Sequence, residues 1–312
     1  MFSLPPCARS LGAGRKRHNA FEKLCRVGPD RNKNIESEHG PGPLNTRAGR
    51  VAETRNMERL LVDPRYAPAF AARGWGSFAS VFAHFLPDYA RLRKMTVQRV
   101  TVPMPTGGVD AFFKLYHLRA SAWLFWMRAP KARREFQNYQ TFARLGVPAA
   151  EAIACGEERG AWGQLLRAFI ITRTVPEACE LDDFFQSGPP RAQRDQICRE
   201  LAKAVRRLHT AHFYYHDLVW RNILVSRVGG GSKVFLLDCP RGGMAWFGRG
   251  RKRLRDLASL DKSAVRLCSR PDRLRFLLRY LGKSRPDAES RALARACLHY
   301  RRTRWPEDWR GK

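Results

Sequence analysis

The sequence predicts an α+β fold of two lobes, a small β-rich N-lobe followed by a mainly helical C-lobe. Segments with strand character dominate the first half of the folded sequence, whereas the chain after Leu274 is mainly helical and basic. A length of 312 residues is also sufficient for one large domain or for two lobes with a sizeable core. We therefore expect an N-lobe over residues 57–174 and a C-lobe over residues 175–312.

Residues 1–56 differ in composition from the rest of the chain. They are rich in Gly, Pro, Arg and Asn and show no helical or strand period, which predicts a disordered segment. The segment is either a basic leader of the transit type or a spurious N-terminal extension that precedes a true start at Met57. The second interpretation is favoured because the periodic, aromatic-rich sequence begins at Met57.

The sequence of the expected N-lobe predicts a β-hairpin, a helix and a buried strand, in this order. Residues 97–103 and 111–116 are strand-like, and the turn residues 105–108 between them predict a β-hairpin. Residues 131–145 carry aromatic side chains at helical spacing and predict a helix. The short apolar run at residues 169–172 predicts a buried strand.

Two further elements are expected at the start of the C-lobe. Apolar residues recur at helical spacing after Pro189 and Pro190, which predicts a second long helix. Downstream, apolar runs on either side of glycines 229–231 predict a hairpin whose second strand ends at Asp238.

The charge of the chain implies an anionic partner. The formal net charge is +30, and +24 remains without residues 1–56, which carry 11 basic and 5 acidic residues. Nucleic acid, an anionic membrane surface, and a phosphorylated or acidic glycolipid all satisfy this requirement. The apolar runs are too short to cross a bilayer, and the first residues lack the apolar core of a signal peptide.

The cysteines point to a reducing compartment. All eight are scattered along the chain, and no two form a C-x-x-C pair. This pattern favours neither a structural zinc site nor a disulfide framework. We therefore expect a cytosolic protein.

The most informative motif lies between the predicted helix and hairpin of the C-lobe. Asp217 precedes Asn222 by five residues, and Asp238 ends the second strand of the hairpin. Phosphoryl-transfer loops place a proton-accepting Asp and a metal-binding Asn at this spacing, with a second metal-binding Asp beyond the hairpin. Upstream, Lys114 lies on an inner strand and Glu135 on the following helix, as in kinases that pair such a lysine with nucleotide phosphates.

With these motifs in this order, the chain resembles the bacterial lipopolysaccharide kinases, which phosphorylate core sugars such as Kdo or heptose and share a protein-kinase-like fold. The resemblance covers residues 78–280. The segments that carry it are Phe113-Lys114, Arg134-Glu135-Phe136, Leu145-Gly146-Val147-Pro148, Phe169-Ile170-Ile171-Thr172, Leu181-Asp182-Asp183-Phe184, the loop from Asp217 to Asn222, Leu237-Asp238 and Arg255-Asp256-Leu257.

The resemblance implies a role for each motif residue. Asp217 is the expected catalytic base, Lys114 with Glu135 the expected nucleotide-binding pair, and Asn222 with Asp238 the expected metal ligands. ATP and Mg²⁺ are the implied cofactors, and residues 89–96 are the segment best placed to cover the nucleotide. Some members of the family lack an asparagine at the position of Asn222, so kinases at large support that role better.

A cluster of basic residues follows Asp238 closely. It is either a solvated face or a surface for substrate phosphates and acidic sugars. The aromatic segment at residues 116–128 is either core or a contact with a membrane interface. The basic residues expected to bind substrate are Arg249, Arg251, Lys252 and Arg253, with Arg255 beside them.

The sequence thus predicts an ATP-dependent kinase that acts on a sugar hydroxyl, of Kdo or heptose, in lipopolysaccharide core. The expected partner is this anionic glycolipid, and the expected location is the cytoplasm, with peripheral contact at the inner membrane. The alternatives are a protein Ser/Thr/Tyr kinase and a catalytically inactive kinase-like protein that binds nucleic acid. His216 in place of the Arg of H-R-D, and the absence of A-P-E soon after Asp238, argue against a protein kinase.

Overall fold

The computed structural model describes residues 57–87, 96–105, 107–117, 129–227 and 231–306. The predicted leader, most of the expected nucleotide-covering segment and most of the aromatic segment before residue 129 lie outside the described residues.

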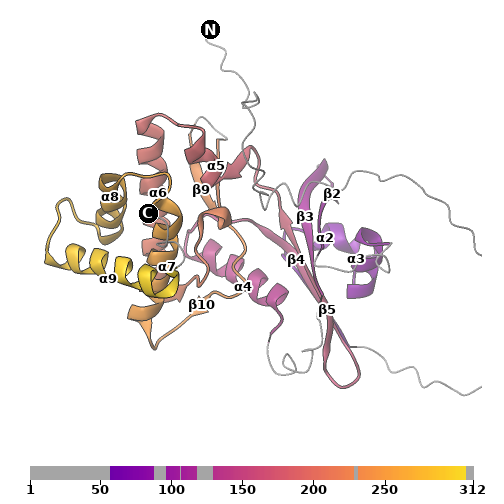
Figure 1. Cartoon of the computed structure of the whole chain (residues 1–312). Coiled ribbons are helices and arrows are strands. Elements are labelled where there is room, and N and C mark those ends of the chain that lie inside the picture. Colours follow the sequence, from indigo (N-terminus) through magenta and orange to yellow (C-terminus); the bar gives the residue numbers. More distant parts are fainter. Residues whose placement is uncertain (1–56, 88–95, 106, 118–128, 228–230, 307–312) are drawn as a thin grey trace, which may run out of the picture. The chain divides into compact units, whose positions relative to one another are not determined.

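The N-lobe is built on a five-stranded antiparallel sheet with the strand order β1-β4-β5-β3-β2 (Figure 1). The predicted hairpin is confirmed, because β2 and β3 pair from Thr96 opposite Leu115 to Met104 opposite Gly107. In contrast, β1 lies at the far edge of the sheet and pairs with β4. The strands are β1 (Met57–Val62), β2 (Thr96–Met104), β3 (Gly107–His117), β4 (Ala152–Arg159) and β5 (Leu165–Arg173).

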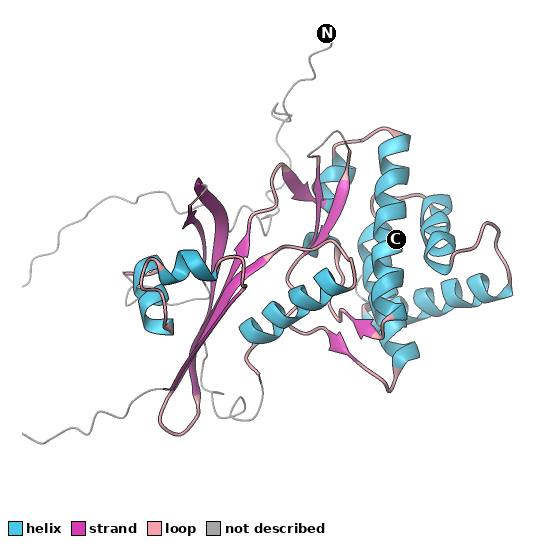
Figure 2. Ribbon diagram, turned by 180° about the vertical axis from the view of Figure 1, so that it is seen from behind, coloured by secondary structure: helices cyan, strands magenta, loops and turns pink. Residues whose placement is uncertain are grey.

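Helices cover both faces of this sheet (Figure 2). On one face, α2 (Ala67–Ala71) and α3 (Phe78–Phe85) bury aromatic side chains against β3 and β5. On the other face, α4 (Lys131–Arg144) packs against β4 and β5. The helix predicted over residues 131–145 is therefore confirmed, with Leu145 as its cap.

The C-lobe is mainly helical, as the sequence predicts. The long helix expected after Pro190 is α6, and the expected hairpin is β8 with β9. Helices α6 and α8 pack together, as do α7 and α9. The elements are β6 (Ala178–Glu180), α5 (Leu181–Gln186), α6 (Arg191–Thr210), β7 (Phe213–Tyr214), the 3₁₀ turn η3 (Trp220–Asn222), β8 (Ile223–Ser226), β9 (Lys233–Leu236), β10 (Gly243–Met244), α7 (Arg249–Ala264), α8 (Arg270–Leu281) and α9 (Ala288–Arg304).

The predicted lobe boundary at residues 174 and 175 falls between β5 and β6, and it stays a prediction. Among the described helices, none combines the length and apolar character needed to cross a bilayer.

Candidate active site

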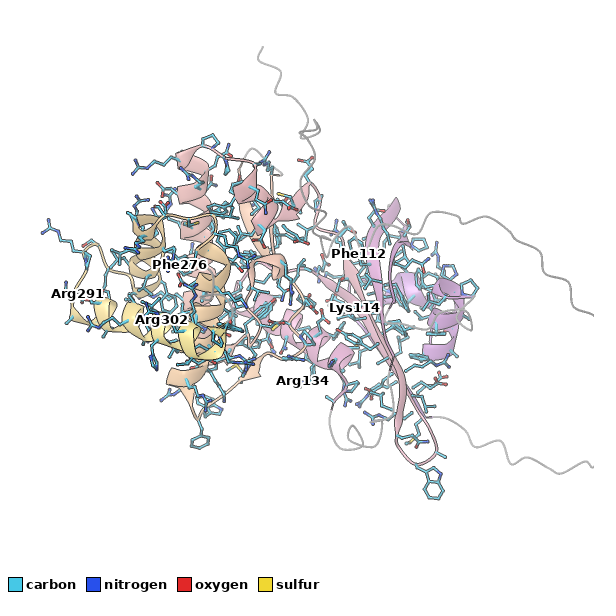
Figure 3. All side chains as sticks on the ribbon, in the orientation of Figure 1. Phe112, Lys114, Arg134, Phe276, Arg291 and Arg302 are labelled. Carbon is cyan, nitrogen blue, oxygen red and sulfur yellow. The ribbon has the colours of Figure 1, made fainter. Side chains whose placement is uncertain are left out.

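The alternation of β3 places Lys114 on the α4 side of the sheet. Its neighbours Phe113 and Leu115 are fully buried in the aromatic cluster under α3. Because successive strand residues point to opposite faces, Lys114 and Tyr116 face α4 instead, where both contact Glu135. Lys114 is labelled in Figure 3. The lysine Nζ lies 2.5 Å from Asp238 Oδ1 and 3.4 Å from Glu135 Oε2.

Glu135 orients this lysine from α4. The carboxylate is buried, and the hydroxyls of Tyr116 and Tyr139 donate hydrogen bonds to its two oxygens at 2.5 and 3.1 Å. Burial raises the pKa of Glu135, against the opposing effect of the positive charge on Lys114. Burial acts in the opposite direction on Lys114, but Glu135 and Asp238 outweigh it, so the pKa of Lys114 is raised. The lysine is therefore held as a cation.

Asp238 lies two residues beyond the end of β9 and has an unusual backbone conformation. Its φ of 55° is in the left-handed region, which non-glycine residues rarely adopt. The backbone N–H of Asp238 donates to the Tyr139 hydroxyl at 2.9 Å, and this bond fixes the strained residue. The carboxylate remains 48% exposed, so it is open to a ligand.

Asp217 and Asn222 belong to one short loop between β7 and β8. The Asn222 side-chain nitrogen donates to the Asp217 carbonyl at 2.9 Å, and the Asn222 carbonyl accepts from the Leu237 backbone N–H at 2.9 Å. The second bond places Asn222 opposite the residue that precedes Asp238. The five predicted residues thus form two linked groups, Lys114 with Glu135 and Asp238, and Asp217 with Asn222.

A buried carboxylate that sequence reasoning did not assign to the site supports this loop. Asp256, on α7, is fully buried and accepts the backbone N–H groups of Tyr215 and His216 at 2.7 and 2.8 Å. His209 lies 3.3 Å from the same carboxylate and 2.8 Å from the Tyr280 hydroxyl. His216 itself has a φ of 70°. Asp256 therefore fixes the strained residue that directly precedes Asp217.

Asn138 fixes the chain beyond Asp238 in the same way. Its side-chain nitrogen donates to the carbonyls of Cys239 and Gly242, at 2.7 and 3.1 Å. A single asparagine on a helix belongs to no recognisable motif, so this contact could not be predicted from the sequence. The Arg255-Asp256-Leu257 segment of the resemblance was the available signal for Asp256.

The residues of the predicted basic cluster have different contacts and lie in different places. The Arg255 guanidinium lies 3.4 Å from His216 Nδ1. Burial lowers the pKa of His216, and the nearby charges of Arg255, Lys252 and Arg134 add to this effect, although Asp256 opposes it. The Arg253 guanidinium packs over the Tyr280 ring, 5.1 Å from its centre.

The remaining residues of the cluster lie at the beginning of α7. Arg249 approaches His212 at 3.3 Å, and Arg251 is exposed. The structure thus brings Arg255 to the Asp217 loop, ties the Lys252 ammonium to the Phe247 carbonyl, and leaves Arg249 and Arg251 at the beginning of α7.

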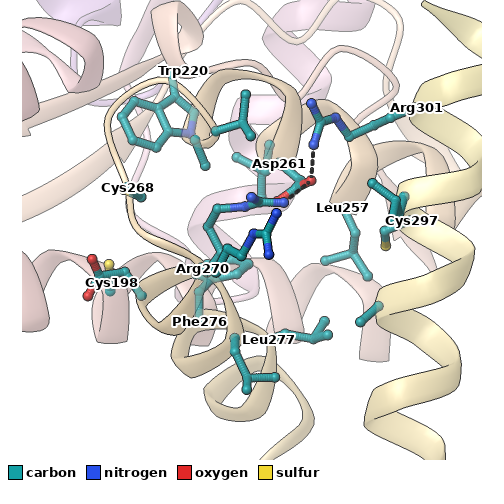
Figure 4. A pocket seen from close by; sticks show the side chains of 18 of the residues that line it. Cys198, Trp220, Leu257, Asp261, Cys268, Arg270, Phe276, Leu277, Cys297 and Arg301 are labelled. Atoms are coloured by element: carbon teal, nitrogen blue, oxygen red, sulfur yellow. Dashed lines mark hydrogen bonds and ion pairs between the residues drawn. The ribbon is translucent and has the colours of Figure 1, made fainter. Parts of the chain in front are cut away.

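A separate cavity of about 730 Å³ opens among the helices of the C-lobe (Figure 4). Its lining is largely apolar and includes Leu257 and Phe276. Asp261 forms ion pairs there with Arg273 at 2.6 Å and Arg301 at 2.5 Å. None of the five predicted catalytic, nucleotide-binding and metal-binding residues lines this cavity.

Comparisons with known proteins agree on one family. The model of the lipopolysaccharide kinase (Kdo/WaaP) family matches residues 113–280. The 3-deoxy-D-manno-octulosonic acid kinases of Actinobacillus succinogenes and Haemophilus influenzae PittEE are 32% and 28% identical, each over 35% of this chain. The matched regions span 45% and 44% of those proteins, so the chain covers about half the length of these relatives.

A solved structure shows the same fold. The structure described as WaaP in complex with acyl carrier protein matches with a TM-score of 0.57 at 20% identity. The match covers 80% of this chain and 99% of that one. The predicted α+β, protein-kinase-like fold is therefore confirmed.

Proposed function

The chain belongs to the lipopolysaccharide kinase (Kdo/WaaP) family, and from this premise we propose that it transfers the γ-phosphoryl group of ATP to a sugar hydroxyl of lipopolysaccharide core. The acceptor sugar is Kdo or heptose. The observation that carries the proposal is the contact of Lys114 with both Glu135 and Asp238, beside a loop that holds Asp217 and Asn222 together. Four separate parts of the chain, namely β3, α4, the loop from Asp217 to Asn222 and the segment after β9, converge in these contacts, as phosphoryl transfer requires.

Each residue has a distinct part in the proposal. Asp217 accepts the proton of the attacking hydroxyl. The buried Asp256 fixes the backbone of His216, the residue that directly precedes Asp217. Lys114 binds nucleotide phosphates, and Glu135 keeps its ammonium group in place.

The oxygen donors near Asp238 fit a magnesium ion. Mg²⁺ prefers carboxylate and carbonyl oxygens, and Asp238 offers a half-exposed carboxylate. Asn222 uses its side-chain nitrogen on the Asp217 carbonyl, which leaves the amide oxygen as its ligating atom. When bound, the ion neutralises charge on the phosphates during transfer.

Positive side chains near Asp217 are proposed to hold the acceptor. The Arg255 guanidinium lies 3.4 Å from Nδ1 of His216, the residue that directly precedes Asp217. Besides burial, the positive charges of Arg255, Lys252 and Arg134 all lower the pKa of His216. Among the described residues, no carboxylate forms an ion pair with these three cations. An acidic or phosphorylated core sugar supplies the missing anion. Arg249, Arg251 and Arg253 stay a prediction as substrate ligands, although Arg253 contacts Tyr280.

The alternative of a protein kinase is disfavoured by the chain between Asp238 and α7. The helix begins at Arg249, so ten residues separate it from Asp238. β10 occupies part of this segment and pairs with β7. There is no room for a long activation loop that orders a peptide substrate. A kinase-like protein that only binds nucleic acid would not need the buried Lys114–Glu135 pair.

The proposed acceptor implies a location. Lipopolysaccharide core is a membrane glycolipid, so we propose that the protein works in the cytoplasm at the inner face of the membrane. The positive charge of the chain supports this placement, because the cytoplasmic surface carries anionic lipids.

The test is phosphoryl transfer to two lipid-linked acceptors, one ending in Kdo and one in heptose. The wild-type chain should transfer phosphate from ATP to one of them, and Asp217→Asn should lower the rate by about 10² to 10⁴-fold, the usual contribution of a general base. Asp110→Asn is the matched control, because Asp110 is an exposed carboxylate paired with Arg99 at the far end of β3. Equal rates for wild type and Asp217→Asn, or no transfer by wild type, would refute the proposal.

A further inference from the structure

Large apolar side chains are exposed in the segment between Asp238 and α7. Phe247 is 89% exposed, Trp246 66% and Met244 53%. Exposed apolar residues scattered singly are ordinary, but these three lie within four consecutive positions. Such clusters mark interaction sites.

The segment that carries them is held in place at both ends. Its first part is fixed by Asn138 through the carbonyls of Cys239 and Gly242. β10 pairs with β7, and the backbone N–H of Ala245 donates to the His212 carbonyl at 2.9 Å.

The other end is fixed to α7. The Lys252 ammonium donates to the Phe247 carbonyl at 3.0 Å. The backbone of Phe247 is therefore tied down while its ring faces solvent. A fixed loop that presents aromatic rings is suited to contact another surface.

The charged residues around these apolar side chains are all positive. Residues 239–255 contain six basic residues and no acidic residue. Arg241, Arg249 and Arg251 are exposed and flank the aromatic positions in the sequence. In Figure 1, the connection from β10 to α7 lies at the lower edge of the C-lobe. The patch thus combines apolar side chains with a row of cations.

We propose that Met244, Trp246 and Phe247 insert into the surface of an anionic lipid bilayer while Arg241, Arg249 and Arg251 bind its headgroups. Tryptophan and phenylalanine are the residues that amphipathic anchors place at the boundary of headgroups and acyl chains. Each cation adds attraction to the anionic surface. We define residues 241–251 as the membrane-docking segment.

The membrane-docking segment extends the proposed function. It rests on that function in one respect, because it assumes that the acceptor is a membrane glycolipid. β7 joins the docking segment directly to the catalytic loop, since Tyr214 pairs with Gly243 and lies three residues before Asp217. Docking through this segment would bring the acceptor sugar to Asp217 without a spanning helix. A kinase has no need of a long activation loop when the bilayer presents its substrate.

Vesicle sedimentation of the full chain, without ATP or acceptor, tests the inference. The probes are vesicles of phosphatidylethanolamine with phosphatidylglycerol, and vesicles of phosphatidylcholine alone. Wild type should bind the anionic vesicles more strongly, and added salt should weaken the binding. Trp246→Ala with Phe247→Ala should lower partitioning by at least about tenfold. Arg249→Glu with Arg251→Glu should lower it by at least about twentyfold, at about fivefold for each lost cation.

The matched control is Arg199→Glu with Lys203→Glu, which reverses two exposed cations on α6. This variant has the same net charge as the Arg249 and Arg251 variant, so it should bind far better if position rather than net charge decides. The altered side chains are exposed, so thermal unfolding should be unchanged. Equal binding by all variants would overturn the inference. A dimer that depends on Trp246 and Phe247, with no vesicle binding, would overturn it in favour of a protein interface. Because no phosphoryl transfer is measured, these outcomes are independent of the kinase test.

Discussion

The two faces of the N-lobe sheet show how one strand serves both stability and chemistry. On β3, Phe113 and Leu115 are fully buried among the aromatic side chains under α3. Lys114, between them, points to the other face and contacts Glu135 and Asp238. One face therefore holds an apolar core, and the other holds charged groups that burial penalises.

Burying the charged face lowers the stability of the lobe unless every charged group has a partner. Burial of an unpaired charge is strongly unfavourable, yet here the ammonium of Lys114 meets two carboxylates and Glu135 accepts two tyrosine hydroxyls. A comparable volume of apolar side chains would stabilise the lobe at least as well. We infer that the polar face is maintained for ligand binding rather than for stability.

The largest effect is expected on the apolar face. Phe113→Ala should lower the free energy of unfolding by about 3–5 kcal/mol, because it leaves a cavity between Phe85 and Phe169. Chemical denaturation measures this loss. Phosphoryl transfer per folded molecule should stay close to wild type. A loss of transfer in the fraction that remains folded would show that the two faces are not separable.

Substitution of the neighbouring residue, Lys114, should reduce phosphoryl transfer strongly and stability less. Lys114→Met should lower the rate of transfer by about 10² to 10³-fold, as the loss of one electrostatic contact to a reacting group does. Its unfolding free energy should fall by less than that of Phe113→Ala, because Glu135 keeps its two tyrosine hydrogen bonds and its raised pKa lets it take up a proton when the cation is lost. Steady-state kinetics and denaturation of the two variants, side by side, make the comparison. A larger stability loss for Lys114→Met would contradict this division between the faces.

Substitution of Glu135 should lower the rate of transfer less than substitution of Lys114 does, and it should change the pH dependence of stability. Burial raises its pKa in the folded chain, so the folded state binds the proton more tightly than the unfolded state does. The stability from this group is complete below its unfolded pKa, about 4.3, and is lost as the pH rises through the folded value. Wild type should therefore lose stability relative to Glu135→Gln as the pH is raised from about 4.

Denaturation of both proteins across this pH range measures the difference. Transfer by Glu135→Gln should be about tenfold slower, because Lys114 loses a partner that fixes its position. A wild type that gains stability over Glu135→Gln as the pH rises would show that the ion pair, rather than burial, controls this carboxylate.

The sequence predicted the parts of the site that local patterns mark. The spacing of Asp217 and Asn222, the strand position of Lys114 and the helix position of Glu135 are visible without a structure. The structure brings Lys114, Glu135 and Asp238 into contact, and their roles stay proposals.

Contacts between distant residues could not be predicted. Tyr139 and Asn138 bind the chain around Asp238 from about a hundred positions away, and an isolated Tyr or Asn on a helix carries no signal. The edge position of β1 depends on pairing with β4, which the hydrophobic pattern of a single strand does not specify. The exposure of Trp246 and Phe247 could not be predicted either, because large aromatic residues are usually at least partly buried.

Mass spectrometry of core oligosaccharide tests directly whether the chain phosphorylates a core sugar in cells. Cells without this protein would be supplied with the wild-type chain, Asp217→Asn or Asp110→Asn. We expect one core sugar, Kdo or heptose, to gain the mass of one phosphate with wild type and with Asp110→Asn, but not with Asp217→Asn. Identical core oligosaccharide in all three cases, with the proteins present at equal levels, would contradict it.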